Sequence, residues 1–218
     1  MRRSEALTGV AFGLPGLGLA LVGVFHPHGL SYDSAQRWFL LHVAGLVVFP
    51  LVGVALAALM GRRRDVLAWA VRVTAYLYAT FYSALDVISG IAAGYVTREL
   101  GPGQPRPDEV RLLFRIGSPL GEIGSWALLG CCALAAGDQL RRHGVAAFPG
   151  LVLVPGAWLV HVDHIFAPAG VTGMGLIGLG TAWLAVLETR KASSAEQTPL
   201  PPSSASRGDA HEAQQREK

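Results

Sequence analysis

The sequence predicts an all-α integral membrane protein, a polytopic bundle of about six transmembrane helices. Of its 218 residues, 51% are hydrophobic and only 15% are charged, whereas a soluble chain carries roughly 25% charged residues. The charges gather in short clusters separated by apolar stretches of about 20 residues, which is the length that crosses the hydrocarbon core of a bilayer. Composition and charge spacing therefore indicate the same class.

Each expected helix ends at proline, glycine or charged residues, which terminate membrane helices. We expect helices over residues 6–25, 38–60, 66–96, 108 or 118 to 136, 146–166 and 171–187. The first stretch resembles a signal peptide, but it is long, contains Pro15 and has no small-residue cleavage pattern before His26, so we expect it to be retained as a helix. Residues 1–188 therefore form the predicted transmembrane domain.

The composition changes abruptly after Glu188. Residues 189–218 are rich in Ser, Pro, Glu, Gln and Arg and contain few large apolar side chains. Such a segment buries too little surface to offset its ordering entropy, so we predict a disordered cytoplasmic tail. Cys131 and Cys132 are adjacent within an apolar run, which excludes a disulfide framework.

The basic residues predict how the chain is oriented. The basic residues on the side of the membrane that holds the N-terminus are Arg2, Arg3, 62–64, Arg141, Arg142, Arg190 and Lys191. Those on the other side are Arg37, Arg98, Arg106, Arg111 and Arg115. The positive-inside rule makes the first side cytoplasmic, with both termini inside the cell and the protein in the plasma membrane. The chain has a net charge of +3, but its basic residues are not interleaved with aromatic residues as they are on nucleic-acid-binding surfaces. The expected partner is therefore the lipid bilayer, and no nucleic acid is expected to bind.

Ionisable residues inside the expected helices predict the functional site. Insertion of such a residue at mid-membrane costs about 2.5–3.5 kcal/mol, so those that persist face the bundle interior and find partners. The residues of this kind are His42, Asp86, Glu122, His161 and His164. With a rise of 1.5 Å per residue along alternating helices, all five fall in the extracytoplasmic half.

Imidazole and carboxylate ligands together suit zinc and other divalent transition metals. His42, Asp86, His161 and His164 supply the ligand count of a tetrahedral zinc site. Glu122 then lies beside the metal as a partner of its ligands or as a general base acting on bound water. The expected activity is hydrolysis of a lipid-like substrate, and a small-molecule ligand is also compatible with the site.

The order of these residues resembles that of the seven-helix membrane hydrolases related to alkaline ceramidases. Those proteins have a His on the second helix, an Asp on the third and paired His residues on a late helix, and the matching positions here are His42, Asp86, His161 and His164. The chain departs from that pattern in helix number, in the spacing of the His pair, and at Trp38, where the family has Ser. The resemblance implies metal-dependent hydrolysis.

Other interpretations of the same residues remain open. A proton-coupled transporter would titrate Asp86 and Glu122. A haem-binding electron carrier would use His42 and His161 as axial ligands. A non-catalytic membrane module would use the cluster only to fix helix packing. We expect His26, which follows the first helix, to lie in an interfacial loop rather than in the site.

Overall fold

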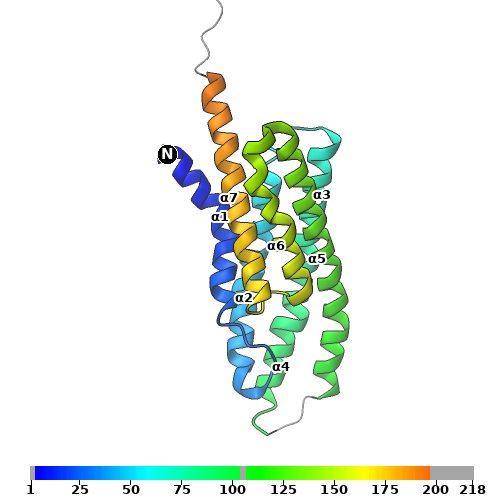
Figure 1. Cartoon of the computed structure of the whole chain (residues 1–218). Helices are drawn as coiled ribbons and strands as arrows, with labels where there is room; N and C mark the ends of the chain where they lie inside the picture. Colours follow the sequence, from blue (N-terminus) through cyan, green and yellow to red (C-terminus); the bar gives the residue numbers. More distant parts are fainter. Residues whose placement is uncertain (1–2, 104–106, 197–218) are drawn as a thin grey trace, which may run out of the picture.

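The computed structural model describes residues 3–103 and 107–196, which form an all-α bundle (Figure 1). Its helices are α1 (Arg3–Gly23), α2 (Tyr32–Ala58), α3 (Val66–Leu85), α4 (Ala93–Glu99), α5 (Asp108–His143), α6 (Leu153–Asp163) and α7 (Ala169–Glu196). A π-helical segment, η1 (Asp86–Ala92), joins α3 to α4, and a 3₁₀ segment, η2 (Gly144–Val152), joins α5 to α6. The predicted all-α class is confirmed.

Five helical runs among the described residues are long and apolar enough to cross a membrane. They are Arg3–Gly23, Tyr32–Ala58, Val66–Glu99, Asp108–Asp163 and Ala169–Ser194. The fourth run contains 56 residues, because helical structure continues through η2. Gly144 adopts a φ of 58° at this junction, and η2 and α6 return alongside α5 (Figure 1).

Local hydrogen bonds explain two of the helix starts. Ser31 and Ser34 form a capping box, so α2 begins at Tyr32, ahead of the expected start at 38. Asp65 caps α3 by accepting a hydrogen bond from the amide of Ala68 at 3.0 Å. A hydrogen bond from Arg63 is the main reason that the pKa of Asp65 falls to about 2.

The third predicted helix, 66–96, is one helical run, but its middle is π-helical. A π-turn leaves backbone carbonyls out of the regular α-helical pattern and frequently marks a functional site. The indole N–H of Trp38 donates to the carbonyl oxygen of Ser89 at 3.0 Å, and the ring of His42 packs against Gly90. Contacts from α2 therefore support the irregular segment.

The last helix is longer than the predicted span 171–187. α7 continues to Glu196, past the predicted domain boundary at 188, and its final turns project beyond the body of the bundle (Figure 1). Residues 197–218, on which the prediction of a disordered tail mainly falls, lie outside the described residues.

The end of the bundle where α5 stops is held by charged contacts. Asp138 is fully buried and forms ion pairs with Arg63, Arg141 and Arg142. Arg142 also pairs with Glu188 of α7. These contacts tie the α2–α3 turn, α5 and α7 together and satisfy a carboxylate that would otherwise be costly to bury.

Helices α1 and α7 cross closely through small residues. A Cβ added at Gly16 would lie 2.7 Å from the backbone nitrogen of Gly178, whereas one added at Gly18 would meet nothing within 4 Å. Close backbone approach of this kind drives helix association where apolar burial cannot, because lipid is as apolar as the side chains.

We expect Gly16→Ala to destabilise the bundle by about 1–3 kcal/mol, because the methyl group forces α1 and α7 apart. Gly18→Ala is the matched control, and its higher helix propensity should leave stability unchanged or slightly raised. Thermal unfolding of both variants in detergent checks this prediction. Equal midpoints for the two variants would contradict the close packing of α1 on α7.

Candidate metal centre

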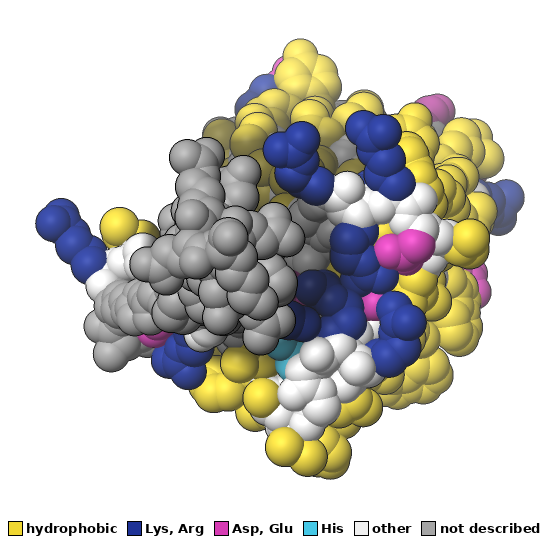
Figure 2. All heavy atoms as spheres, turned by 90° about the horizontal axis from the view of Figure 1, so that it is seen from above, with side chains coloured by type: hydrophobic (Ala, Val, Ile, Leu, Met, Phe, Trp, Pro, Cys, Tyr) yellow, Lys and Arg dark blue, Asp and Glu magenta, His cyan; other side chains and the backbone are white. Residues whose placement is uncertain are grey.

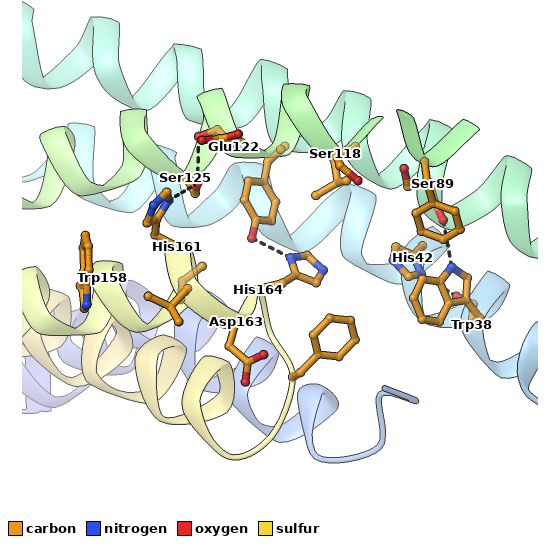
Figure 3. Close-up of a pocket in the computed structure, with 17 residues that line it drawn as sticks. Trp38, His42, Ser89, Ser118, Glu122, Ser125, Trp158, His161, Asp163 and His164 are labelled. Atoms are coloured by element: carbon orange, nitrogen blue, oxygen red, sulfur yellow. Dashed lines mark hydrogen bonds between the residues drawn. The ribbon is translucent and has the colours of Figure 1, made fainter. Parts of the chain in front are cut away.

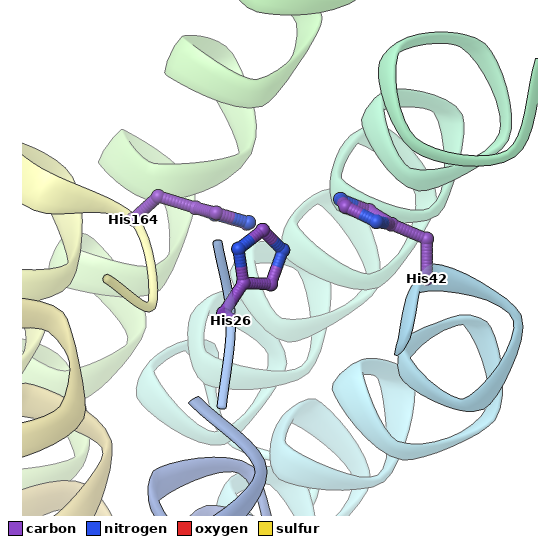
Figure 4. A group of neighbouring side chains, drawn as sticks. All are labelled: His26, His42 and His164. Atoms are coloured by element: carbon purple, nitrogen blue, oxygen red, sulfur yellow. The ribbon is translucent and has the colours of Figure 1, made fainter. Parts of the chain in front are cut away.

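Three histidines from separate parts of the chain meet inside the bundle. His26 follows α1, His42 lies on α2, and His164 caps the end of α6. Each offers one ring nitrogen, and the three nitrogens lie within 4.8 Å of one another. Figure 4 shows the ring of His26 between those of His42 and His164. We call this group the histidine triad.

His26 is brought into the triad by the way α1 ends. The chain leaves the helix in a tight turn, in which the amide of His26 donates to the carbonyl oxygen of Gly23 at 3.0 Å. A Cβ at Gly23 would lie 2.7 Å from the carbonyl oxygen of Ile165. Glycine therefore lets the end of α1 touch the segment that carries His164, and His26 is buried with 4% exposure.

His42 is positioned by its own helix and by the π-helical segment. Its Nδ1–H donates to the carbonyl oxygen of Trp38, one turn earlier, at 2.7 Å. A Cβ at Gly90 would lie only 2.1 Å from Cδ2 of His42, so no larger residue fits there with this ring orientation. The ring is 5% exposed.

His164 sits at a special backbone position. Its φ of 51° is in the left-handed region, which is uncommon for a residue with a Cβ and is often found at functional sites. This conformation ends α6 and turns the side chain into the bundle. Its Nδ1 is 2.7 Å from the hydroxyl of Tyr82 on α3.

The outer hydrogen bonds fix which ring nitrogen of His26 and of His42 is unprotonated. Carbonyl oxygens only accept, so Nδ1 of His42, on the carbonyl of Trp38, and Nδ1 of His26, on the carbonyl of Pro27 at 2.8 Å, both carry the proton. Their Nε2 atoms then present lone pairs. Nε2 of His26 is buried and has no hydrogen-bond partner among the described residues. For His164, the Tyr82 hydroxyl accepts or donates, so either tautomer is compatible.

The triad is built for neutral imidazoles. Burial lowers the pKa of His26 below its ordinary value, because loss of water disfavours the imidazolium. The rings of His42 and His164 are nearly parallel with centroids 6.4 Å apart, and that of His26 stands edge-on to both. Aromatic rings of Trp38, Phe49 and Phe166 surround them. A cluster of neutral imidazole nitrogens of this kind suits a transition-metal ion.

A pocket of about 600 Å³ adjoins the triad. Figure 3 shows it extending from Trp38 and His42, past His164, to His161 and Trp158. Its polar lining residues are Ser89, Ser118, Glu122, Ser125 and Asp163. Aromatic walls with a few polar groups are typical of ligand sites.

The structure brings together some of the predicted site residues. His42 and His164 belong to the triad. His161 lies at the other end of the pocket, where its Nδ1 is hydrogen-bonded to Ser125 at 2.8 Å and its ring contacts Trp126. Glu122 also lines the pocket, and its side chain is exposed.

Asp86, the remaining predicted ligand, is fully buried at the start of the π-helical segment. Neither of its carboxylate oxygens has a hydrogen-bond partner among the described residues. A Cβ added at Gly45 would lie 3.0 Å from Oδ2 of Asp86, which places the carboxyl against α2, outside the triad.

His26 is the residue that sequence reasoning missed. It was expected in an interfacial loop, but it is buried in the triad, whereas its neighbour His28 is exposed and bonds to the carbonyl of Ala167. Its expected depth in the membrane could have indicated its place in the site, because His26 follows the first helix on the side where the other ionisable residues gather. Depth alone does not distinguish a side chain that turns into the bundle from one that faces water.

Comparison with known proteins identifies no relative of this chain. No protein-family model matches the chain, and no curated protein or solved structure matches it significantly. Of the four residues that carry the resemblance to membrane hydrolases, His42 and His164 lie in the triad, and Asp86 and His161 lie outside it.

We expect Tyr82→Phe to destabilise the protein by about 1–2 kcal/mol, because Nδ1 of half-buried His164 loses its hydrogen-bond partner. Tyr78→Phe is a matched control, since the buried Tyr78 hydroxyl has no hydrogen-bond partner in the described part of the chain. Its removal should be neutral or stabilising. Thermal unfolding midpoints in detergent measure both effects, and a larger loss for Tyr78→Phe would contradict the assigned hydrogen bond.

Proposed function

We propose that this protein is a six-pass membrane protein that binds a zinc-type divalent metal ion on His26, His42 and His164. The observation that carries the proposal is the meeting of three histidine nitrogens within 4.8 Å, two of them on buried residues and the third on half-buried His164. Three protein ligands with an open fourth position are the arrangement of catalytic zinc sites. We propose further that the ion serves to hydrolyse a lipid-like substrate held in the adjoining pocket.

The spacing of the triad supports a bound ion of this size. Nitrogen ligands lie about 2.0–2.1 Å from zinc, so two of them in a tetrahedral site are about 3.3–3.4 Å apart. The upper limit of 4.8 Å therefore requires two nitrogens to approach by up to about 1.4 Å, which rotations of the rings supply. The outer hydrogen bonds of the Nδ1 atoms are the kind that orient metal-bound histidines.

The remaining residues would act on the substrate. When bound, a zinc ion lowers the pKa of its water and polarises the bond to be cleaved. Glu122 is the proposed general base, as its carboxylate lines the same pocket. The aromatic side chains of Trp38, Phe114 and Trp158 also line the pocket and offer apolar surface to a lipid-like chain.

A six-pass topology follows if η2 and α6 together cross the membrane as the return from α5. Both the start of α1 and the end of α7 then lie at the end of the bundle where arginines gather (Figures 1 and 2). By the positive-inside rule that end is cytoplasmic and the triad lies toward the outer leaflet. The plasma membrane is the proposed location.

We expect purified full-length protein to bind about one zinc ion per chain at the three-histidine site. His42→Gln should weaken binding on the order of 100-fold, because a ligand is lost. His28→Gln, at an exposed residue nearby, is the control and should bind as the wild type does. Metal content after dialysis, measured by elemental analysis, checks this prediction.

The same measurement separates the triad from the ligand set predicted from the sequence. His161→Gln should retain zinc if the triad binds the ion, and His26→Gln should lose it. The reverse result would show that His161 is a ligand and His26 is not. Zinc bound equally by all four variants would contradict a histidine site altogether.

We expect Glu122→Gln to lower hydrolysis by about 10²–10⁴-fold, the usual contribution of a general base. The variant should keep its zinc, since Glu122 is not a proposed ligand. Release of a fluorescent acyl chain from glycerolipid and sphingolipid substrates in mixed micelles measures the activity. Full activity of Glu122→Gln would show that Glu122 is not the general base. If the wild type releases no acyl chain in a zinc-dependent manner, the proposed hydrolysis is wrong, although the metal site is not contradicted.

A further inference from the structure

A second pocket, of about 620 Å³, lies at the end of the bundle opposite the α4–α5 loop. Its lining residues are Arg62, Arg63, Arg64, Trp69 and Arg72, which come from the α2–α3 turn and the first turns of α3. Four arginines and no carboxylate line it. Figure 2 shows Lys and Arg side chains gathered over this face of the molecule.

Two of the four guanidinium groups already have partners. Arg63 forms ion pairs with Asp65 and Asp138. Arg72 donates to the carbonyl oxygen of Gly61 at 2.9 Å and lies over the ring of Trp69, 5.6 Å from its centroid. These contacts hold one side of the pocket in place.

The other two, Arg62 and Arg64, form no hydrogen bond or ion pair with any part of the chain that the structure describes. The pocket therefore presents positive charge that no described carboxylate balances. Guanidinium groups match phosphate oxygens in geometry and form short, charge-assisted hydrogen bonds with them. The chemistry of the lining residues favours a phosphate group as the ligand.

An apolar stripe on α3 indicates which phosphate compound fits. Val66, Trp69, Val73 and Tyr76 are 87%, 55%, 50% and 68% exposed. Their spacing of three and four residues places them on one face of the helix. Trp69 belongs to both the pocket and the stripe, and tryptophan is enriched at membrane interfaces. A free anion would contact the arginines alone, whereas a phospholipid would also cover the stripe.

We propose that this pocket binds the phosphate headgroup of an anionic phospholipid, with an acyl chain lying along the exposed stripe of α3. Basic pockets on the cytoplasmic side of membrane helices bind anionic headgroups in this way. The proposal is independent of the metal centre, which lies elsewhere in the bundle. It assigns to the α2–α3 turn a lipid site that fixes the depth and orientation of this end of the protein.

Native mass spectrometry of the full chain, released from detergent with equimolar phosphatidylglycerol and phosphatidylcholine, tests the proposal. The wild type should retain phosphatidylglycerol in preference to phosphatidylcholine. The double variant Arg62→Gln/Arg64→Gln should lower that preference by about 30-fold, since each basic residue near an anionic headgroup contributes about a factor of five. Arg62→Gln alone should lower it by about five-fold, which keeps the test decisive if the double variant does not fold.

Arg111→Gln/Arg115→Gln is the matched control, because it removes the same charge from exposed positions in the first turns of α5, at the end of the bundle away from this pocket. It should keep the wild-type preference. Equal retention of the two lipids by the wild type, or an equal loss in the control, would overturn the proposal. Displacement of the lipid by an equal concentration of inorganic phosphate would also overturn it, because a free anion would then be the ligand.

Discussion

The site depends on one constraint: a buried imidazole needs a partner for each of its two ring nitrogens. Backbone carbonyls accept hydrogen bonds from Nδ1–H of His26 and His42, which leaves the Nε2 atom of each ring with a lone pair to present. Nε2 of His26 has no hydrogen-bond partner among the described residues. Buried acceptors without donors are costly, and in a triad of neutral rings a cation is the partner that satisfies several lone pairs at once. The proposed metal site follows from that requirement.

The irregular parts of the fold all serve this constraint. The π-helical segment places Gly90 against His42 and offers the Ser89 carbonyl to Trp38. The left-handed conformation of His164 ends α6 and turns its ring inward. Regular α-helices alone would not give these positions. At the opposite end, ion pairs around Asp138 and Arg142 hold the α2–α3 turn, α5 and α7 together, so the bundle is fixed by charge at one end and carries its histidine cluster toward the other.

The sequence was sufficient for the all-α class and for helices long and apolar enough to cross a membrane, because length and apolar composition decide both. It also placed His42 and His164 among its five candidates, since ionisable residues in a span face inward. It did not separate these two from Asp86, Glu122 and His161, which lie outside the triad. His26 could not be assigned, because its burial depends on the contact between Gly23 and Ile165, which are far apart in the chain. The π-turn depends equally on tertiary contacts, because Trp38 and His42 of α2 pack against Ser89 and Gly90.

X-ray absorption spectroscopy at the zinc edge, on full-length protein loaded with one equivalent of zinc, tests the central claim most directly. A site formed by the triad should give a first shell of nitrogen and oxygen at about 2.0–2.1 Å. Outer-shell scattering should correspond to three imidazole rings, and to two in the zinc that the weakened site of His26→Gln still holds at the high protein concentration of this measurement. A spectrum without imidazole scattering, or one that His26→Gln leaves unchanged, would contradict a metal centre at His26, His42 and His164.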